Sequence, residues 1–161
     1  PFFNGERTPN YPKGKGCICG LTPDNMKPEN IYRASMEAAI FGLKLGLNSF
    51  IKHGFHPKEI RIVGGGSKSK LWSQMVADVC NLTTVNPEIP EAAAFGSALQ
   101  AYWALLKNEG SRKSIEEITK EHIKINSNSI NHPIPENIPQ YEKAYQLYLK
   151  YVENFRPIFS A

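Results

Sequence analysis

Residues 59 to 78 constrain the fold of this chain more than any other segment. A short predicted strand over residues 59–63 leads into three consecutive glycines, Gly64, Gly65 and Gly66, and then into a helical pattern that opens at Ser67. A strand that feeds a turn and a helix leaves unpaired backbone N–H groups and a helix dipole at the turn. Because glycine lacks a Cβ, a flat or anionic ligand can approach the backbone there. The segment favours a nucleotide site, although a plain tight connection explains the glycines equally well.

The glycine run matches neither of two common phosphate-binding patterns. No Lys-Ser or Lys-Thr pair follows a glycine at the spacing of a P-loop. The glycines are also consecutive, so the dinucleotide pattern G-x-G-x-x-G cannot be drawn through them. The sequence of the turn alone therefore does not identify the ligand.

Composition excludes several classes of partner. The 161 residues suit one domain, and the hydrophobic fraction of 41% with 21% charged residues is typical of a folded protein. The net charge is +4, but lysines and acids are interleaved, whereas a nucleic-acid surface needs clustered basic residues. The apolar runs are too short to span a membrane. We expect neither nucleic acid nor membrane as a partner.

The first residue and the cysteines of the chain add further expectations. The chain opens at Pro1 without a methionine, so we expect a fragment of a longer protein. Its three cysteines, Cys17, Cys19 and Cys80, match neither a disulfide framework nor a zinc pattern. We expect reduced, buried thiols, no metal site and a cytoplasmic protein. In a strand over residues 16–21, Cys17 and Cys19 would share one face.

Hydrophobic periodicity and turn residues predict alternating strands and helices. Residues 1–15 read as a loop, and a helix opens at Pro28 and stops before Gly54 and Pro57. Strands are predicted at residues 16–21, 59–63 and 82–85, and further helices at about 67–80 and 91–106. This alternation predicts an α/β layered domain. The small residues in the first half of the 91–106 helix suit either close backbone packing or simple helix propensity.

The last third of the chain is more polar. Residues 107–139 should hold one short helix near residues 114–121, followed by an exposed loop. Residues 139–157 form an amphipathic pattern whose aromatic side should dock a terminal helix onto the body of the domain.

Taken together and in order, the motifs resemble the C-terminal domain of FGGY carbohydrate kinases. The residues that carry the resemblance are Gly5-Glu6-Arg7-Thr8-Pro9, Gly20-Leu21-Thr22, Arg33-Ala34 with Glu37, Ile62 to Ser67, Trp72 to Gln74, Ala77-Asp78, and Glu91 with Ala94 to Ala98. The resemblance covers about residues 1–110 strongly and the terminal helix loosely. The Gly5–Pro9 loop and the tyrosine-rich terminal helix are most similar to the xylulose-phosphorylating branch of the family.

This resemblance implies a ribonuclease H-like, actin-type ATPase domain with a mixed sheet and flanking helices. Residues 1–161 would form the C-terminal, nucleotide-binding domain of a two-domain sugar kinase. An N-terminal domain outside this chain would provide most sugar contacts, the catalytic aspartate and the Mg²⁺ ligands. ATP and Mg²⁺ are the implied cofactors, and this chain alone would be inactive.

The resemblance also assigns residues to the site. By position, Gly64, Gly65 and Gly66 would form the wall of the adenine and ribose pocket. Ser69 falls where some relatives carry an asparagine that contacts the nucleotide, and Ser67 would cap the following helix.

Three acids and one arginine of these motifs have expected roles outside the glycine turn. Glu6 and Arg7 would lie near the interdomain cleft and position substrate or brace closure, while a plain surface ion pair remains open. Asp78 lies well along a helix, where capping or pairing is the expected role, and Glu37 lies mid-helix, where a solvated or salt-bridged role is expected.

The expected function of the full-length protein is transfer of the ATP γ-phosphate to the 5-hydroxyl of D-xylulose. Another kinase of the family, acting on glycerol, gluconate or ribulose, is an alternative. A non-catalytic, actin-fold nucleotide-binding module is a third. The sequence leaves a homodimer open.

Overall fold

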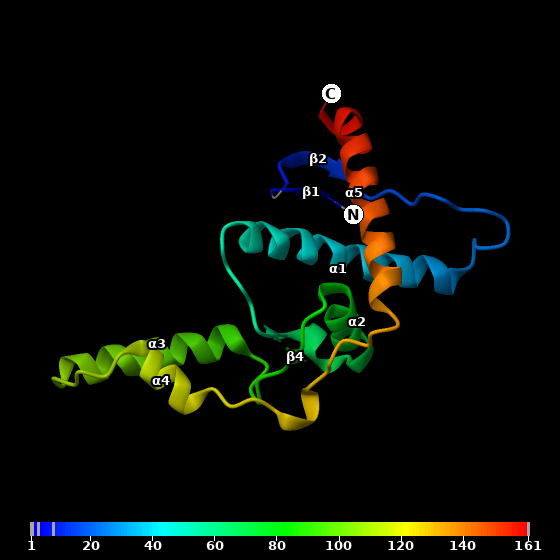
Figure 1. Ribbon diagram of the computed structural model, residues 1–161. Helices are drawn as coiled ribbons and strands as arrows, with labels where there is room; N and C mark the ends of the chain where they lie inside the picture. The colour runs from blue at the N-terminus through cyan, green and yellow to red at the C-terminus, as the bar shows by residue number, and fades with distance from the viewer. Residues whose placement is uncertain (1, 3, 8, 161) are drawn as a thin grey trace. The chain divides into compact units, whose positions relative to one another are not determined.

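The computed structural model describes residues 2, 4–7 and 9–160, and the chain divides into two compact units (Figure 1). The first unit comprises Pro1–Pro57, Asp78–Asn81 and Pro133–Ala161. The second unit comprises Lys58–Ala77 and Leu82–His132. Within the described residues, no helix combines the length and hydropathy that crossing a membrane requires.

The first unit begins with a β-hairpin. Strand β1 (Asn4–Glu6) pairs antiparallel with β2 (Tyr11–Lys15). Gly5 has φ +80°, and a Cβ there would lie 2.5 Å from the Pro12 carbonyl oxygen, so only glycine fits. The predicted loop over residues 1–15 is therefore wrong. Proline and glycine within the paired residues hide the strand pattern from the sequence. Thr8, which belongs to the motif at residues 5–9, lies outside the described residues.

Helices α1 (Pro28–Lys52) and α5 (Ile138–Ser160) pack together in this unit (Figure 1). Pro28 occupies the first turn of α1, where its missing N–H costs nothing, and Gly54 follows the helix with φ +88°. The predicted bounds of α1 are confirmed. The ring of Phe41 lies 5.7 Å from that of Tyr145 and 5.5 Å from that of Tyr148, centre to centre. These aromatic contacts hold α5 against α1.

Helix α5 also covers the hairpin. The Tyr11 hydroxyl donates a hydrogen bond to the Val152 carbonyl oxygen at 3.1 Å, and the Phe2 and Tyr11 rings stack beside it. The strand predicted at residues 16–21 is absent, because these residues are irregular coil. Cys17 is half-buried and Cys19 is exposed, so the two thiols do not form the buried strand face that we predicted.

The second unit contains a parallel strand pair. Strand β3 (Ile60–Arg61) leads through the 3-10 helix η1 (Gly65–Lys68) and α2 (Lys70–Cys80) to β4 (Thr84–Val85). β3 and β4 are parallel, with Ile60 opposite Thr84. Both strands are shorter than predicted. The α/β class is confirmed, and its mixed strand pairing takes the form of two small sheets, one antiparallel and one parallel.

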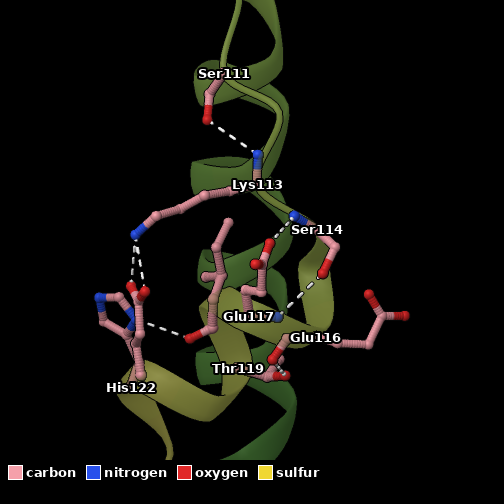
Figure 2. A network of polar contacts seen from close by, with 9 residues as sticks. Ser111, Lys113, Ser114, Glu116, Glu117, Thr119 and His122 are labelled. Carbon is pink, nitrogen blue, oxygen red and sulfur yellow. Dashed lines mark hydrogen bonds and ion pairs between the residues drawn. The ribbon is translucent and has the colours of Figure 1, made fainter.

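Helices α3 (Ala92–Asn108) and α4 (Ile115–His122) form close to the predicted residues, and they lie side by side (Figure 1). Figure 2 shows how α4 begins: the Ser114 hydroxyl accepts from the Glu117 N–H, and the Glu117 carboxylate accepts from the Ser114 N–H. This capping box satisfies two N–H donors at once. Just before it, the Lys113 ammonium pairs with Glu121 at 2.8 Å.

The segment after α4 runs beside β4. Thr84 exchanges two backbone hydrogen bonds with Asn131, both 3.0 Å, and the Glu88 N–H donates to the Lys124 carbonyl oxygen at 2.9 Å. A further 3-10 turn, η2 (Ser127–Ser129), lies between these contacts. We predicted an exposed loop here. Its side chains are largely exposed, but its backbone is paired with the strand. Backbone pairing satisfies polar groups without any hydrophobic pattern, which explains the difference.

Candidate functional site

The three glycines lie at the carboxyl edge of the β3–β4 pair. β3 enters the glycine turn directly, and the Ile62 N–H donates to the Val85 carbonyl oxygen at 2.9 Å. The Gly64 N–H then donates to the Pro90 carbonyl oxygen at 3.0 Å, which joins the turn to the start of α3. Ligands of open α/β sheets bind at this edge, beyond the carboxyl ends of parallel strands. The topology therefore puts the turn where a ligand is expected.

The structure explains the presence of glycine differently at each of the three positions. Gly64 has φ +71°, a conformation that other residues adopt only with strain. A Cβ on Gly66 would lie 3.1 Å from Nε1 of Trp72, which leaves little room. Gly65 is different. Its φ is not positive, and a Cβ there would meet no atom of the described structure within 4 Å. Neither the backbone nor its neighbours require glycine at position 65.

Ser67 and Ser69 hold the turn in shape. The Ser67 hydroxyl donates to the Gly64 carbonyl oxygen at 2.7 Å, across the turn. Ser69 Oγ accepts from the Trp72 N–H at 3.2 Å and so caps α2. The predicted cap at Ser67 is wrong, because η1 adds one tight turn before α2 begins. The first N–H groups of such a helix have no acceptor within it, which leaves those of Gly65 and Gly66 as candidate donors to a ligand.

The start of α3 is flat and accessible. Ala93, Ala94, Gly96, Ser97 and Ala98 are all exposed. The two interpretations of these small residues were close packing and helix propensity. The described structure buries none of the five, so they present a shallow surface directly after the segment that binds Gly64.

Glu6 and Arg7 lie in the first unit, whereas the glycine turn lies in the second. Both residues are exposed at the end of β1, and the Arg7 N–H donates to Glu6 Oε1 at 2.7 Å. The Glu6 carboxylate thus stabilises its own turn.

Asp78 and Glu37 have the structural roles that we predicted. The buried Asp78 carboxylate accepts from the Ile134 N–H and from the Asn137 side-chain amide, each at 2.8 Å. Glu37 pairs with Arg33 at 2.8 Å, and this hydrogen bond is the main cause of the raised pKa of the Arg33 guanidinium. Arg33 also donates to the Tyr141 hydroxyl. Both carboxylates therefore have structural partners within helices and loops.

Sequence reasoning missed Asn86. This residue follows β4, and its side-chain amide donates to the Ser67 carbonyl oxygen at 2.8 Å. Its position directly after β4 becomes a signal only once β3 and β4 are known to be parallel and in register, which the sequence does not show.

Comparison with known proteins identifies the family. The family model described as "FGGY family of carbohydrate kinases, C-terminal domain" matches residues 1–105. The chain is 42% identical over 152 residues to a xylulose kinase of Haemophilus influenzae, covering 94% of this chain and 30% of that protein. It is 36% identical over 141 residues to a ribulokinase of Geobacillus thermodenitrificans, covering 87% of this chain and 25% of that protein. The chain belongs to the FGGY family of carbohydrate kinases.

The solved structures agree on the fold. A ligand-bound xylulose kinase from Lactobacillus acidophilus superimposes with a TM-score of 0.83 at 26% identity, over 96% of this chain and 30% of that one. A gluconate kinase from the same organism gives a TM-score of 0.85 at 25% identity, over 99% of this chain and 31% of that one. The chain therefore has the actin-like ATPase fold of these sugar kinases. It spans less than a third of the length of each of these four relatives.

Proposed function

We propose that this chain is the C-terminal, nucleotide-binding part of a longer kinase that transfers the γ-phosphate of ATP to a sugar hydroxyl. The observation that carries the proposal is Gly65. It is a glycine that neither its backbone angles nor its neighbours require, at the sheet edge where ligands bind. Its missing side chain leaves space through which a flat ring can reach the backbone.

The residues of the turn would have different roles in binding. Gly64 reverses the chain, and Gly65 and Gly66 offer backbone N–H groups. Ser67 and Ser69 fix the turn from inside through the hydrogen bonds described above. The turn would form one wall of the adenine and ribose pocket. A wall that is rigid before binding loses little entropy when the nucleotide arrives.

The turn does not suit Mg²⁺. This ion prefers carboxylate oxygens and water, and residues 64–70 contain no acid. Among the described residues, no cluster of three or more His, Cys, Asp or Glu side chains could hold a metal. Phosphoryl transfer also needs a group that accepts the proton of the attacking hydroxyl. We place the metal ligands and this base, expected to be an aspartate, in the part of the protein that precedes this chain in its relatives.

D-xylulose is the sugar that we favour, with D-xylulose 5-phosphate as the product. The support is the 42% identity to a xylulose kinase and the motif at residues 5–9. Glu6 and Arg7 of that motif would then help to position the sugar or brace closure of the two domains. Relatives named for ribulose and gluconate also match, so kinases of those sugars and of glycerol are the alternatives.

The test is a coupled assay of ADP release with Mg·ATP in the full-length protein that contains this chain. We expect the highest kcat/KM with D-xylulose, and lower values with ribulose, gluconate and glycerol. The 161-residue chain alone should give background rates. Sugar-dependent turnover by the chain alone would refute the division of the active site. ATP binding by the full-length protein without phosphorylation of any of these acceptors would favour a non-catalytic nucleotide-binding module.

A further inference from the structure

The glycine turn is held from outside by Asn86. The Asn86 Nδ2 group donates to the Ser67 carbonyl oxygen at 2.8 Å, and the Ser67 hydroxyl donates to the Gly64 carbonyl oxygen at 2.7 Å. Two consecutive hydrogen bonds therefore connect Asn86 to the first residue of the turn. The orientation of the amide is fixed, because turning it round would bring two oxygens to 2.8 Å.

Asn86 is itself held by the segment after α4. Its N–H donates to Ser129 Oγ at 2.8 Å, and its carbonyl oxygen accepts from the Asn126 N–H at 2.9 Å. Ser129 belongs to η2, within the segment that runs beside β4. The connection thus runs from Ser129 through Asn86 and Ser67 to Gly64, entirely within the second unit.

The side chain of Asn86 carries an energetic cost. Its Oδ1 atom is buried and has no hydrogen-bond partner among the described residues. An unsatisfied buried acceptor lowers stability, so a residue with this defect is expected to have a compensating role. Within the described part of the chain, the other end of the amide donates one hydrogen bond to the turn, at the Ser67 carbonyl oxygen.

We propose that Asn86 is a positioning residue for nucleotide binding, and that residues 124–131 set the shape of the glycine turn through it. This inference rests on the proposed function of the turn. The turn is four residues of 3-10 helix, so a shift at the Ser67 carbonyl also moves the N–H groups of Gly65 and Gly66. Loss of the Asn86 amide should loosen the wall against which the nucleotide binds and leave the sugar contacts unchanged.

Trp72 can report on the shape of the turn. Its indole lies close enough to Gly66 that a Cβ there would be 3.1 Å from Nε1, so a movement of η1 changes the surroundings of the ring. The chain contains two tryptophans, and Trp103→Phe leaves Trp72 as the only one in this part of the protein. In the full-length protein, tryptophans outside this chain are replaced in the same way.

The experiment compares four variants of the full-length protein in that background. Asn86→Ala removes the amide, and Ser129→Ala removes the hydroxyl that holds it. Ser127→Ala is the matched control, an exposed serine of the same η2 turn. Gly65→Val tests the turn itself. For each we measure the Kd of ATP, the KM of the sugar, the Trp72 emission and the melting temperature.

We expect Asn86→Ala to weaken ATP binding about tenfold, with the KM of the sugar unchanged and the Trp72 emission shifted. Ser129→Ala should act in the same direction with a smaller effect, and Ser127→Ala should behave as wild type. A purely structural role would instead lower the melting temperature without separating ATP from sugar.

Two results overturn the inference in distinguishable ways. If Gly65→Val weakens ATP binding while Asn86→Ala and Ser129→Ala do not, Asn86 has no positioning role and the proposed function stands. If none of the three changes ATP binding, the proposed function fails and this inference fails with it. Should Asn86→Ala not fold, Ser129→Ala decides: unchanged ATP affinity and unchanged Trp72 emission would overturn the inference.

Discussion

The ammonium group of Lys44 on α1 lies 2.8 Å from Glu142 Oε2 on α5, which makes Glu142 the counter-ion of a lysine that is only 9% exposed. The same ammonium lies 4.7 Å from the centre of the Tyr145 ring. A buried charge is costly unless it is paired and hydrogen-bonded, and here α5 supplies both the anion and an aromatic face. The pair therefore makes the packing of the two helices dependent on one carboxylate.

Replacing that carboxylate should destabilise the first unit. We expect Glu142→Gln to lower the free energy of unfolding by about 1 kcal/mol, because Lys44 loses its counter-ion while the side-chain shape is kept. The value is modest because the Glu142 side chain is half-exposed. Urea denaturation measures the difference. The control is Glu153→Gln on the same helix, whose pair with Arg156 is exposed and 4.0 Å long. Equal effects of the two substitutions would contradict this role of Glu142.

The same pair predicts a dependence on pH. Hydrogen bonds from Lys44 and then from Gln146 lower the pKa of Glu142 below its ordinary value of 4.5. The unfolded chain therefore takes up this proton at a higher pH than the folded chain does. The stabilisation is present above the unfolded pKa and is lost as the pH falls through the folded pKa. Melting temperatures of wild type and Glu142→Gln should differ at pH 7 and converge towards pH 3. A constant difference across this range would contradict the assignment.

Asp78 should be important for stability. Its carboxylate satisfies the Ile134 N–H and the Asn137 amide just before α5, so Asp78→Ala leaves two donors without their acceptor. We expect a loss of about 2–3 kcal/mol in the free energy of unfolding, measured by chemical denaturation. Asn137→Ala removes only one of these bonds and should cost less. A loss no larger than that of Asn137→Ala would show that the backbone contact contributes nothing.

Local signals in the sequence predicted the first long helix well. Pro28 at its first turn and Gly54 after its last turn act through neighbouring residues, so the sequence shows them directly. The β-hairpin was missed, because strand pairing joins residues whose local pattern is interrupted by Pro12 and Gly14.

The prediction of a strand at residues 16–21 was wrong for the opposite reason. Alternation of Cys17, Ile18 and Cys19 suits a strand, but a strand also needs a partner, and these residues are coil.

At the candidate site, the glycines themselves were visible in the sequence. The contacts that fix them were not visible. Asn86 lies 19 residues beyond Ser67 and Pro90 lies 26 residues beyond Gly64, and both reach the turn only through the parallel pairing of β3 and β4.

The three thiols should differ in reactivity. Burial raises the pKa of the Cys80 thiol to about 11, so little thiolate exists at pH 8. Cys19 is exposed and Cys17 is half-buried. In a time course of thiol labelling on this chain at pH 8, we expect Cys19 to react first and Cys80 last. Cys19→Ser should remove the fast phase and Cys80→Ser the slow phase. Cys80 is half-buried like Cys17, so its slow reaction is expected from its raised pKa, and fast labelling of Cys80 in the folded chain would contradict that shift.

Substitutions that enlarge the side chain at position 65 test nucleotide binding at the glycine turn most directly. In the full-length protein, the KM of ATP and the KM of the sugar are measured for Gly65→Ala and Gly65→Val, each with a melting curve. Gly46→Val on α1 is the control, because a Cβ there also meets no atom of the described residues within 4 Å beyond its own helix backbone. We expect intact melting, an unchanged KM for the sugar, and ATP affinity that falls with side-chain size, by ~2 kcal/mol for valine. Intact melting with unchanged ATP affinity in both variants would mean that the nucleotide binds elsewhere.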